Sequence, residues 1–394
     1  MKVAFYPLRF LVILTFFLSG FAVIAQQEHL QGDEDPVDTK PEIDAYIQHH
    51  LQDAHDFHLF TYYSDEGEPH HVGFPLPVIL WGENGLTAFM SSAFHHNDTG
   101  KVVVEKGSSR FVKNHGTIYE LEAGAQTVQF DGEHHPTNAS KPFDLSITKS
   151  VFGILVIGIL MLIWFGGLAR QYKKKQLPTG FGRVLEPLVV YVRDEIAKPN
   201  IGDQYRRFTG YLLTVFFFIW ILNLVGLMPF GFNVTGQLAV TAALAVITLV
   251  IYVVSGNKHF WEHILWMPGV PILIRPVLAV IELIGTLIIK PFSLLVRLFA
   301  NISAGHIVVM SLIAIGMTKF EELTVPGSQA LSIVLSFFIT LIEVLVAFLQ
   351  AYIFTMLSAL FIGMAVADEH HDEVLHDEHG DVIEDTEAVR RDFT

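Results

Sequence analysis

Long apolar runs separated by short polar stretches dominate the chain after residue 149, and runs of this length predict helices that cross a membrane. Three of them have about the length of a single crossing of a ~30 Å hydrocarbon core: Ser150–Leu168, Phe208–Met228 and Leu238–Val254. Two later runs, Val270–Met317 and Ser328–Val366, contain 48 and 39 residues and would be about twice as long as the core if helical. Each is therefore either a pair of spans or one long helix that is strongly tilted or lies along the membrane, and Pro291 is a point at which the first could break.

Residues 1–25 have the pattern of a secretory signal peptide. A basic start is followed by the apolar run Phe10–Ile24, and Val23 and Ala25 provide small residues before the cleavage point. An uncleaved anchor helix is the alternative, but the run is short for a membrane span. In both cases residues 26–149 are expected outside the cytoplasm of a bacterial cell, in the periplasm.

Residues 26–149 begin with a polar, acidic leader and continue with short strand-like pieces that glycine, asparagine or aspartate separate. We expect strands at Lys101–Glu105, Thr117–Leu121 and Gln126–Phe130, and hence a small β-rich domain. Four pairs of adjacent histidines occur in this region: His49–His50, His70–His71, His95–His96 and His134–His135. Adjacent residues of a strand point to opposite faces, so these pairs are poor chelators, and we expect solvated surface rather than a metal site.

Acidic segments lie on both sides of the apolar block. The chain has 40 Asp and Glu residues against 25 Lys and Arg, a net charge of −15, which argues against nucleic acid as a partner because phosphate binding needs a basic face. Residues 367–394 form an acidic, histidine-containing tail that we expect to be solvated. The chain has no cysteine, which excludes disulfides, thiolate catalysis and cysteine-bound zinc.

A basic loop after the first apolar run gives the expected orientation. Residues 170–207 contain nine Lys and Arg residues, and the positive-inside rule places such a loop in the cytoplasm. The first span then runs from outside to inside, which agrees with an exported N-terminal region. Within the loop, Phe181–Ala197 carries Val184, Leu188 and Val192 on one side and is predicted to be an interfacial helix. A cytoplasmic helix packed on protein is the alternative.

Few ionisable residues lie in the apolar block, and each is a candidate for function because charge is costly inside a membrane. Arg297, Asn301 and Ala304 or Gly305 share one helical face, which combines a fixed cation and an amide with small residues that let another helix approach. Arginine stays protonated, so such a face can hold a passing carboxylate without taking its proton. An arginine that snorkels to the headgroups is the alternative.

Three other groups in the block can exchange protons: Glu282, His306 and Glu343. Their positions on either side of a permanent cation suggest a proton path in two parts. For each of them, a hydrogen-bonded polar group between helices is the alternative.

The sequence from Ser293 to His306 resembles the signature of subunit a of F-type ATP synthases, in the string Ser-Leu-Leu-Val-Arg-Leu-Phe-Ala-Asn and the later Ala-Gly-His. Glu282 in Ile-Glu-Leu-Ile and Glu343 seven residues before Gln350 fit the same family, and the resemblance covers about residues 145–366. It implies an all-α polytopic membrane protein with five membrane helices, the last two long and strongly tilted. An interfacial helix and a small N-terminal periplasmic domain complete the expected fold.

The resemblance also implies a role for each matching position. Arg297 would be the stator arginine, which faces the ring of c subunits, pairs with the ionised carboxylate of each c hairpin and blocks leakage between two half-channels. The residues that would line or support the periplasmic half-channel are Asn301, His306, Glu343 and Gln350. Glu282 and Ser293 would lie toward the cytoplasmic half-channel. Many bacterial members carry an acid where this chain has His306 and a histidine where it has Glu343, so the two residue types are exchanged here.

The implied partners are the c ring, the b subunits of the peripheral stalk, the lipid bilayer and, indirectly, the catalytic ATPase head. No cofactor and no metal is implied, and the subunit would perform no ATP chemistry, in keeping with the lack of a Gly-Lys-Ser/Thr phosphate loop in the sequence. The expected organisation in the bacterial inner membrane is a signal peptide (1–25), a periplasmic extension (26–149), a membrane domain (150–366) and a cytoplasmic tail (367–394).

Two other classes of protein stay open from the residues alone. A proton antiporter predicts an inverted repeat with matching broken helices, and no such repeat is visible in residues 150–366. An envelope binding protein on a multi-span anchor would place the important residues in 26–149 and would make Arg297 dispensable.

Overall fold

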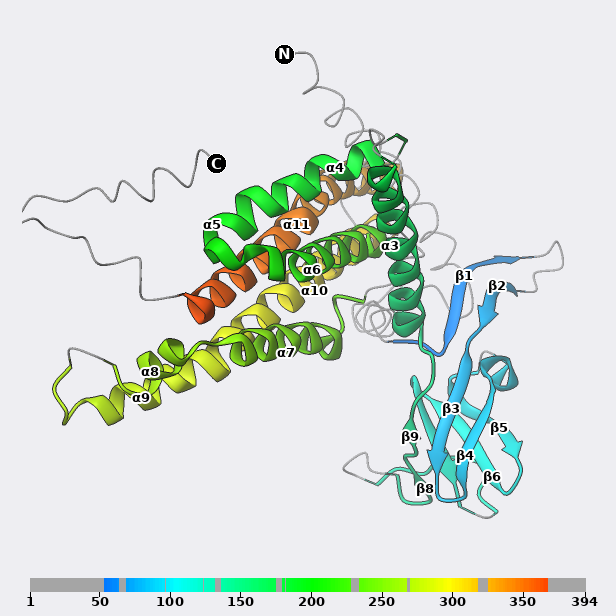
Figure 1. Ribbon diagram of the computed structural model, residues 1–394. Helices are drawn as coiled ribbons and strands as arrows, with labels where there is room; N and C mark the ends of the chain where they lie inside the picture. The colour runs from blue at the N-terminus through cyan, green and yellow to red at the C-terminus, as the bar shows by residue number, and fades with distance from the viewer. Residues whose placement is uncertain are drawn as a thin grey trace, which may run out of the picture.

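The computed structural model describes residues 53–63, 69–95, 97–122, 124–131, 136–174, 179–180, 182–227, 234–267, 270–317 and 325–367. The expected signal peptide lies outside the described residues, as do residues 368–394 of the tail and the pairs His49–His50 and His134–His135. Figure 1 shows a β-rich unit that is joined by helix α3 (Lys149–Lys173) to a group of long helices.

The β-rich unit confirms the small domain expected from the sequence. Its elements are β1 (Asp56–Tyr63), β2 (Pro69–Pro75), β3 (Pro77–Gly82), β4 (Gly85–Met90), the 3-10 turn η1 (Ser91–Phe94), β5 (Thr99–Lys106), β6 (Ser109–Asn114), β7 (Thr117–Leu121), β8 (Ala139–Ser140) and β9 (Phe143–Asp144). All strand pairs are antiparallel: β1 with β2, β3 between β4 and β9, and β5 to β8 in sequence order. Leu80, Phe94 and Phe111 are fully buried in the core between the last two sheets.

Two of the three predicted strands are confirmed, as part of β5 and as β7. The strand predicted at Gln126–Phe130 is wrong, because in this segment only an isolated bridge between Phe130 and Pro136 forms. The side chain of Asn138 accounts for the difference: its Oδ1 accepts from the N–H of Gln129 at 2.8 Å, and its Nδ2 donates to the carbonyl of Thr127 at 2.8 Å. A side chain that binds these backbone groups replaces the ladder partners of a strand.

The β-rich unit is tied to the first turn of α3. The backbone N–H of Ser150 donates to Asp53 Oδ1 at 3.0 Å, so a carboxylate satisfies a free donor at the helix N-terminus. Next to it, His55 Nε2 lies 2.8 Å from Asp144 Oδ2. Burial alone would raise the pKa of Asp144, but the hydrogen bonds from His55 and Ser146 outweigh it and lower that pKa to about 2.

The helical part confirms a polytopic membrane protein. Its elements are α3, α4 (Gly182–Tyr191), the π-helical segment η2 (Val192–Ala197), α5 (Lys198–Ile201), the 3-10 turn η3 (Gly202–Gln204), α6 (Tyr205–Gly226), α7 (Leu238–Ser255), α8 (Lys258–Leu265), α9 (Arg275–Ile284), the π-helical segment η4 (Gly285–Ile289), α10 (Lys290–Met317) and α11 (Val325–Val366). Within the described part of the chain, five helical segments are long and apolar enough to cross a membrane. They include the three single runs expected from the sequence, which appear as α3, α6 and α7.

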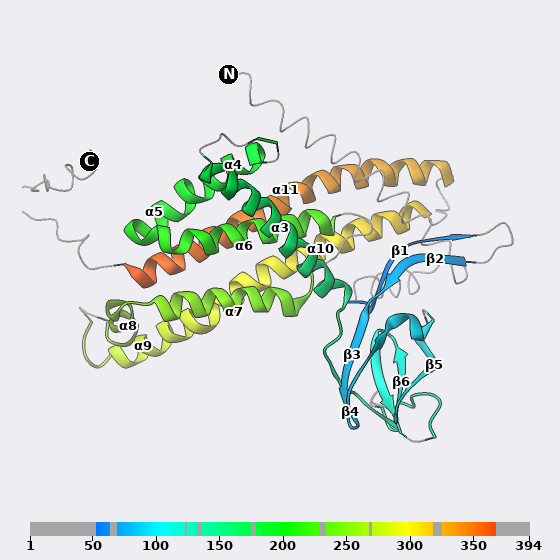
Figure 2. The same cartoon turned by 45° about the vertical axis from the view of Figure 1, so that its right-hand side comes forward.

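Each of the two longest apolar runs is one continuous helix rather than a pair of spans. The first passes from α9 through η4 into α10, and the second is α11 with 42 residues. The two lie side by side in Figure 2. Pro291 does not break the first because the π segment before it changes the hydrogen-bond register: the N–H of Lys290 reaches back five residues to the carbonyl of Gly285. In this register the N–H of residue 291 would donate to the carbonyl of Thr286, but proline has no N–H. The Tyr252 hydroxyl donates to that carbonyl instead.

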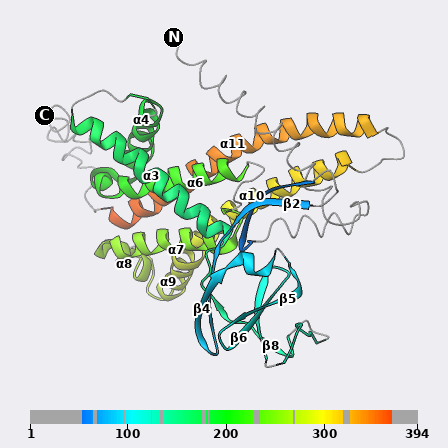
Figure 3. The ribbon, with the colours of Figure 1, turned by 90° about the vertical axis from the view of Figure 1, so that its right-hand side faces the viewer.

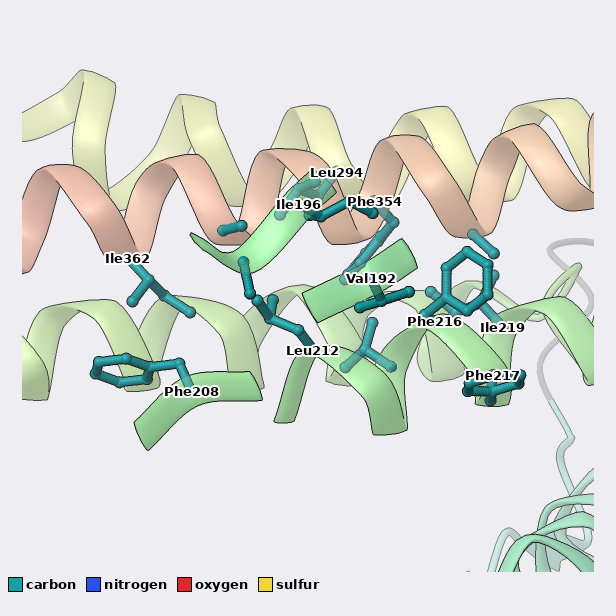
Figure 4. Packing of buried hydrophobic residues seen from close by; sticks show 14 of the residues in the cluster. Val192, Ile196, Phe208, Leu212, Phe216, Phe217, Ile219, Leu294, Phe354 and Ile362 are labelled. Carbon is teal, nitrogen blue, oxygen red and sulfur yellow. The ribbon is translucent and has the colours of Figure 1, made fainter. Parts of the chain in front are cut away.

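The core of the helical part lies where α6 packs against α11 and against the segment η2, which precedes α6 in the chain. Figure 4 shows Leu212 and Phe216 of α6 beside Val192 and Ile196 of η2, and all four are fully or almost fully buried. The predicted helix at Phe181–Ala197 therefore exists, with one face packed on protein; its position on the membrane surface stays a prediction. Val184 does not belong to the buried face and is exposed, because the helical period of that face starts at the next residue.

Candidate functional site

Helix α10 turns the predicted arginine outward. Leu294 and Leu298 are buried in the helical core, at 1% and 0% exposure, and they fix which side of α10 faces inward. Arg297 is half-buried, and Asn301, four residues later, is exposed. Among the described residues, Arg297 makes no ion pair or hydrogen bond with a neighbouring side chain. Within the described part of the chain, Arg297 is therefore an unpaired fixed cation on the outer side of α10.

Helix α11 places Glu343 against the small residue that precedes His306. A β-carbon at Gly305 would overlap Glu343 Oε1 and would lie 3.2 Å from its Cδ, so only glycine leaves room for this carboxyl between the two helices. Oε1 is fully buried and has no hydrogen-bond partner among the described residues. The side chain of His306 lies outside the described residues, although its backbone follows Gly305 directly. Gln350, two helical turns beyond Glu343, is buried on α11.

The remaining predicted residues lie on the other side of Arg297 along the helix. Ser293, one turn earlier, is half-buried, and Glu282 on α9 is also half-buried. At about 1.5 Å per residue, Glu282 is ~22 Å before Arg297 and Gly305 is ~12 Å after it. The structure therefore does not gather the predicted residues in one pocket. It distributes them along the continuous helix α9–η4–α10 and the adjacent α11, with a carboxyl on each side of the fixed cation.

Lys290, a further charged residue of the apolar block, is half-buried and contacts groups within the protein. Its Nζ donates to Thr286 Oγ1 at 3.3 Å and lies 5.5 Å from the centre of the Phe361 ring. Both contacts belong to the same region as the Tyr252 hydroxyl bond, so this lysine stabilises the junction of η4, α10 and α11.

Asn223 is a structural residue of the site that reasoning from residue types did not identify. It is buried on α6, where its Nδ2 donates to the carbonyl of Ala347 at 3.3 Å and its Oδ1 accepts from Thr235 Oγ1 at 2.7 Å. Ala347 is one turn beyond Glu343, so Asn223 links α6 and the start of the next helical hairpin to the turn of α11 that carries the carboxyl. The stretch Asn-Leu-Val-Gly-Leu-Met-Pro, which begins at Asn223, also resembles the family, and this resemblance is the only signal for Asn223 in the sequence.

Comparison with known proteins identifies the helical part. The model of the family described as "ATP synthase A chain" matches residues 151–363, which is more than half of the chain. The chain belongs to the ATP synthase A chain family. A second model, described as "Domain of unknown function (DUF8433)", matches residues 46–145 and thus the β-rich unit.

Curated members of the ATP synthase A chain family are similar along most of their length. ATP synthase subunit a of Chloroherpeton thalassium is 43% identical over 251 residues, which are 62% of this chain and 73% of the relative. ATP synthase subunit a of Myxococcus xanthus is 41% identical over 269 residues, which are 66% of this chain and 85% of the relative. Subunit a 2 of Chlorobaculum tepidum is 42% identical over 265 residues. The resemblance inferred from Ser293 to His306 is confirmed at the level of the family.

Proposed function

We propose that this chain is the stator subunit through which protons cross the membrane sector of an F-type ATP synthase. Membership of the family supports the membrane-sector role in proton translocation. The observation that carries the finer proposal is the outward-facing Arg297, which is half-buried on α10 and has no partner within the described part of the chain. A cation placed in this way is poised for an anion on another subunit.

Arg297 would pair in turn with the carboxylate of each subunit in a rotating c ring. A bare carboxylate is costly in lipid, so each ring carboxylate must take up a proton before it leaves the arginine and turns into the bilayer. Arginine cannot give up its own proton, so it separates the two aqueous sides instead of connecting them. A membrane potential supplies roughly 2.3 kcal/mol per charge per 100 mV, so several protons are needed for each ATP.

The two half-channels would lie on opposite sides of Arg297 along the helix. On the periplasmic side we assign four residues: Asn301, His306, Glu343 and Gln350. On the cytoplasmic side we assign Glu282 and Ser293. The support for this division is the separation of Glu282 and Gly305 along α9 and α10, since a carboxyl lies at each end and the cation between them.

The proposed topology follows from the same reasoning. Residues 1–25 would be a cleaved signal peptide, 26–149 a periplasmic domain, 150–366 the membrane domain and 367–394 a cytoplasmic tail of an inner-membrane protein. The nine Lys and Arg residues of 170–207, from the last turn of α3 to the first turn of α6, support a cytoplasmic location of this segment. We further propose the c ring and the b subunits as direct partners and the catalytic head as an indirect one.

The test is ATP-driven acidification of inverted membrane vesicles at equal subunit abundance. Arg297→Ala should abolish pumping while ATP hydrolysis by the peripheral head stays detectable. Val296→Ala is the control, because Val296 is the neighbouring outward-facing residue and carries no charge. Pumping at the wild-type rate by Arg297→Ala would make this arginine a packing or snorkelling residue, and the half-channel assignments would be abandoned with it.

A further inference from the structure

The outer face of the three-stranded sheet β4-β3-β9 is a grid of apolar side chains. Strand β3 pairs with β4 and β9, and the register continues beyond β9, where the N–H groups of Leu145 and Ile147 donate to the carbonyls of Ile79 and Pro77. Alternate residues of a strand point to the same face, so three rows of three residues share the outer face. From α3 outward, the rows are Met90, Pro77 and Ile147; Ala88, Ile79 and Leu145; Leu86, Trp81 and Phe143.

The row farthest from α3 is the most open to solvent. Leu86, Trp81 and Phe143 are 67%, 61% and 67% exposed. None of the nine residues of the grid is charged, and none of the three exposed side chains packs into either core cluster. Contiguous apolar patches of this kind are rare on soluble domains and mark contact surfaces.

We infer that this face rests on the lipid bilayer around the outer end of α3. Ile147, in the nearest row, is only two residues before α3 begins, and an exposed apolar side of α3 starts at once with Val151 and Leu155. In Figures 2 and 3, α3 descends obliquely from the upper left to the domain, and β4 lies on the left of the domain with β5 and β6 to its right. The outer face of the sheet therefore looks toward the side on which α7 and α8 lie, while α10 and α11 extend above the other side of the domain.

The chemistry of the grid suits a membrane interface. The three rows together cover about 13 Å along β3, because Pro77 and Trp81 are four residues apart at ~3.3 Å each. A patch of this size suits a surface that lies in the headgroup and upper acyl region rather than a segment that penetrates deeply. Trp81 and Phe143 are residues of the aromatic belts found at such interfaces. Lys141, two residues before Phe143, is exposed at the edge of the grid, where an ammonium group can meet lipid phosphates.

Spin labelling can test this inference directly, because the chain has no cysteine of its own. Nitroxide labels at Leu86→Cys and Phe143→Cys are compared in the intact ATP synthase in lipid nanodiscs. The control is Lys106→Cys on β5, an exposed position of the other sheet. Collisions with oxygen, which concentrates in lipid, and with a neutral nickel chelate, which stays in water, are measured for each label.

Contact with lipid predicts high oxygen and low nickel accessibility at both grid positions, so that their oxygen-to-nickel ratio exceeds that of the control several-fold. Low accessibility to both reagents would mean that a protein subunit covers the face and would overturn the inference. A nickel accessibility equal to that of the control would overturn it as well, because the face would then be in water. The inference rests on the proposed topology of α3 and not on Arg297, so a failed pumping test would leave it standing. Conversely, the labelled complexes should pump at the wild-type rate whichever result the labels give.

Discussion

Substitution of Gly305 by alanine tests whether the close approach of α10 and α11 positions the Glu343 carboxyl for proton transfer. The added β-carbon would overlap Oε1 of Glu343 and lie 3.2 Å from its Cδ and 3.5 Å from its Cγ. These atoms are the end of a flexible side chain, so the helices can keep their spacing if the carboxyl turns away. Holding a side chain about 30° from its preferred rotamer costs roughly 0.5–1.5 kcal/mol.

This cost predicts an effect on transport and little effect on assembly. If protons pass only when the Glu343 carboxyl is in its present place, the penalty lowers the rate about two- to twelvefold. The assay is the initial rate of ATP-driven acidification of inverted vesicles, corrected for subunit abundance. Gly363→Ala is the contrasting variant: its β-carbon would overlap the backbone carbonyl oxygen of Asn200 and lie 2.9 Å from the carbonyl carbon. A backbone cannot turn aside, so we expect a stability loss of about 1–3 kcal/mol and less subunit in the complex.

A second change in the same background makes the test specific. Glu343→Asp shortens the side chain by one methylene and withdraws the carboxyl from its present place, so this variant alone should pump more slowly than the wild type. Adding Gly305→Ala to Glu343→Asp should then lower the rate less than it does in the wild type, because the carboxyl that the new methyl group would displace has already been withdrawn. Wild-type pumping by Gly305→Ala would refute the reasoning. A loss of rate that only follows a loss of subunit from the membrane would refute it too.

Two further outcomes follow from hydrogen bonds. Tyr252→Phe leaves a buried backbone carbonyl without a donor, which should cost about 1–3 kcal/mol and lower the thermal midpoint of the purified complex. Tyr211→Phe, which loses only a hydroxyl pair with Thr248, should change that midpoint less, and equal shifts would contradict the role given to Tyr252. Asp144, whose pKa is lowered to about 2 in the folded domain, stabilises it above pH ~4 and loses this contribution as the pH falls toward 2. Since this carboxyl is partly exposed, the contribution is about 1 kcal/mol. Hydrogen exchange of the β-rich unit in the full chain should show this acid-dependent loss, and Asp144→Asn should lack it.

The membrane spans could be predicted from the sequence because every residue of a span that faces the hydrocarbon core has to be apolar. An apolar run of sufficient length is required for a crossing, so the bounds of α3, α6 and α7 follow from local composition. The strand at Thr117–Leu121 was predicted for a similar reason, since its alternation is local. The failure at Gln126–Phe130 has a different cause: the side chain of Asn138 binds that segment from outside it, and no pattern within the segment reports this contact.

The arrangement of the candidate site could be predicted only in part. The spacing around Arg297 predicted that Arg297, Asn301 and Gly305 share one helix face. The contact between Gly305 and Glu343, however, joins residues of two different helices. Their meeting depends on how α10 and α11 pack, which periodicity within each helix does not determine. The continuity of the helix through Pro291 depends likewise on a distant group, the Tyr252 hydroxyl, which takes the place of the donor that proline lacks.

The length of α11 connects the fold to the proposed mechanism. A helix of 42 residues is about 63 Å long, and one that stays within a ~30 Å hydrocarbon core must incline by about 60° from the membrane normal. Because α10 packs along α11, the same inclination applies to the face that carries Arg297. A steeply inclined face follows the rim of a ring over several turns, whereas an upright helix would meet the ring along one line. In the proposed mechanism, this inclination would set Glu282 and Glu343 apart sideways along the rim as well as in depth, and a ring carboxylate would have to pass Arg297 to travel from one to the other. The separation of the two proposed half-channels would then be a consequence of helix length.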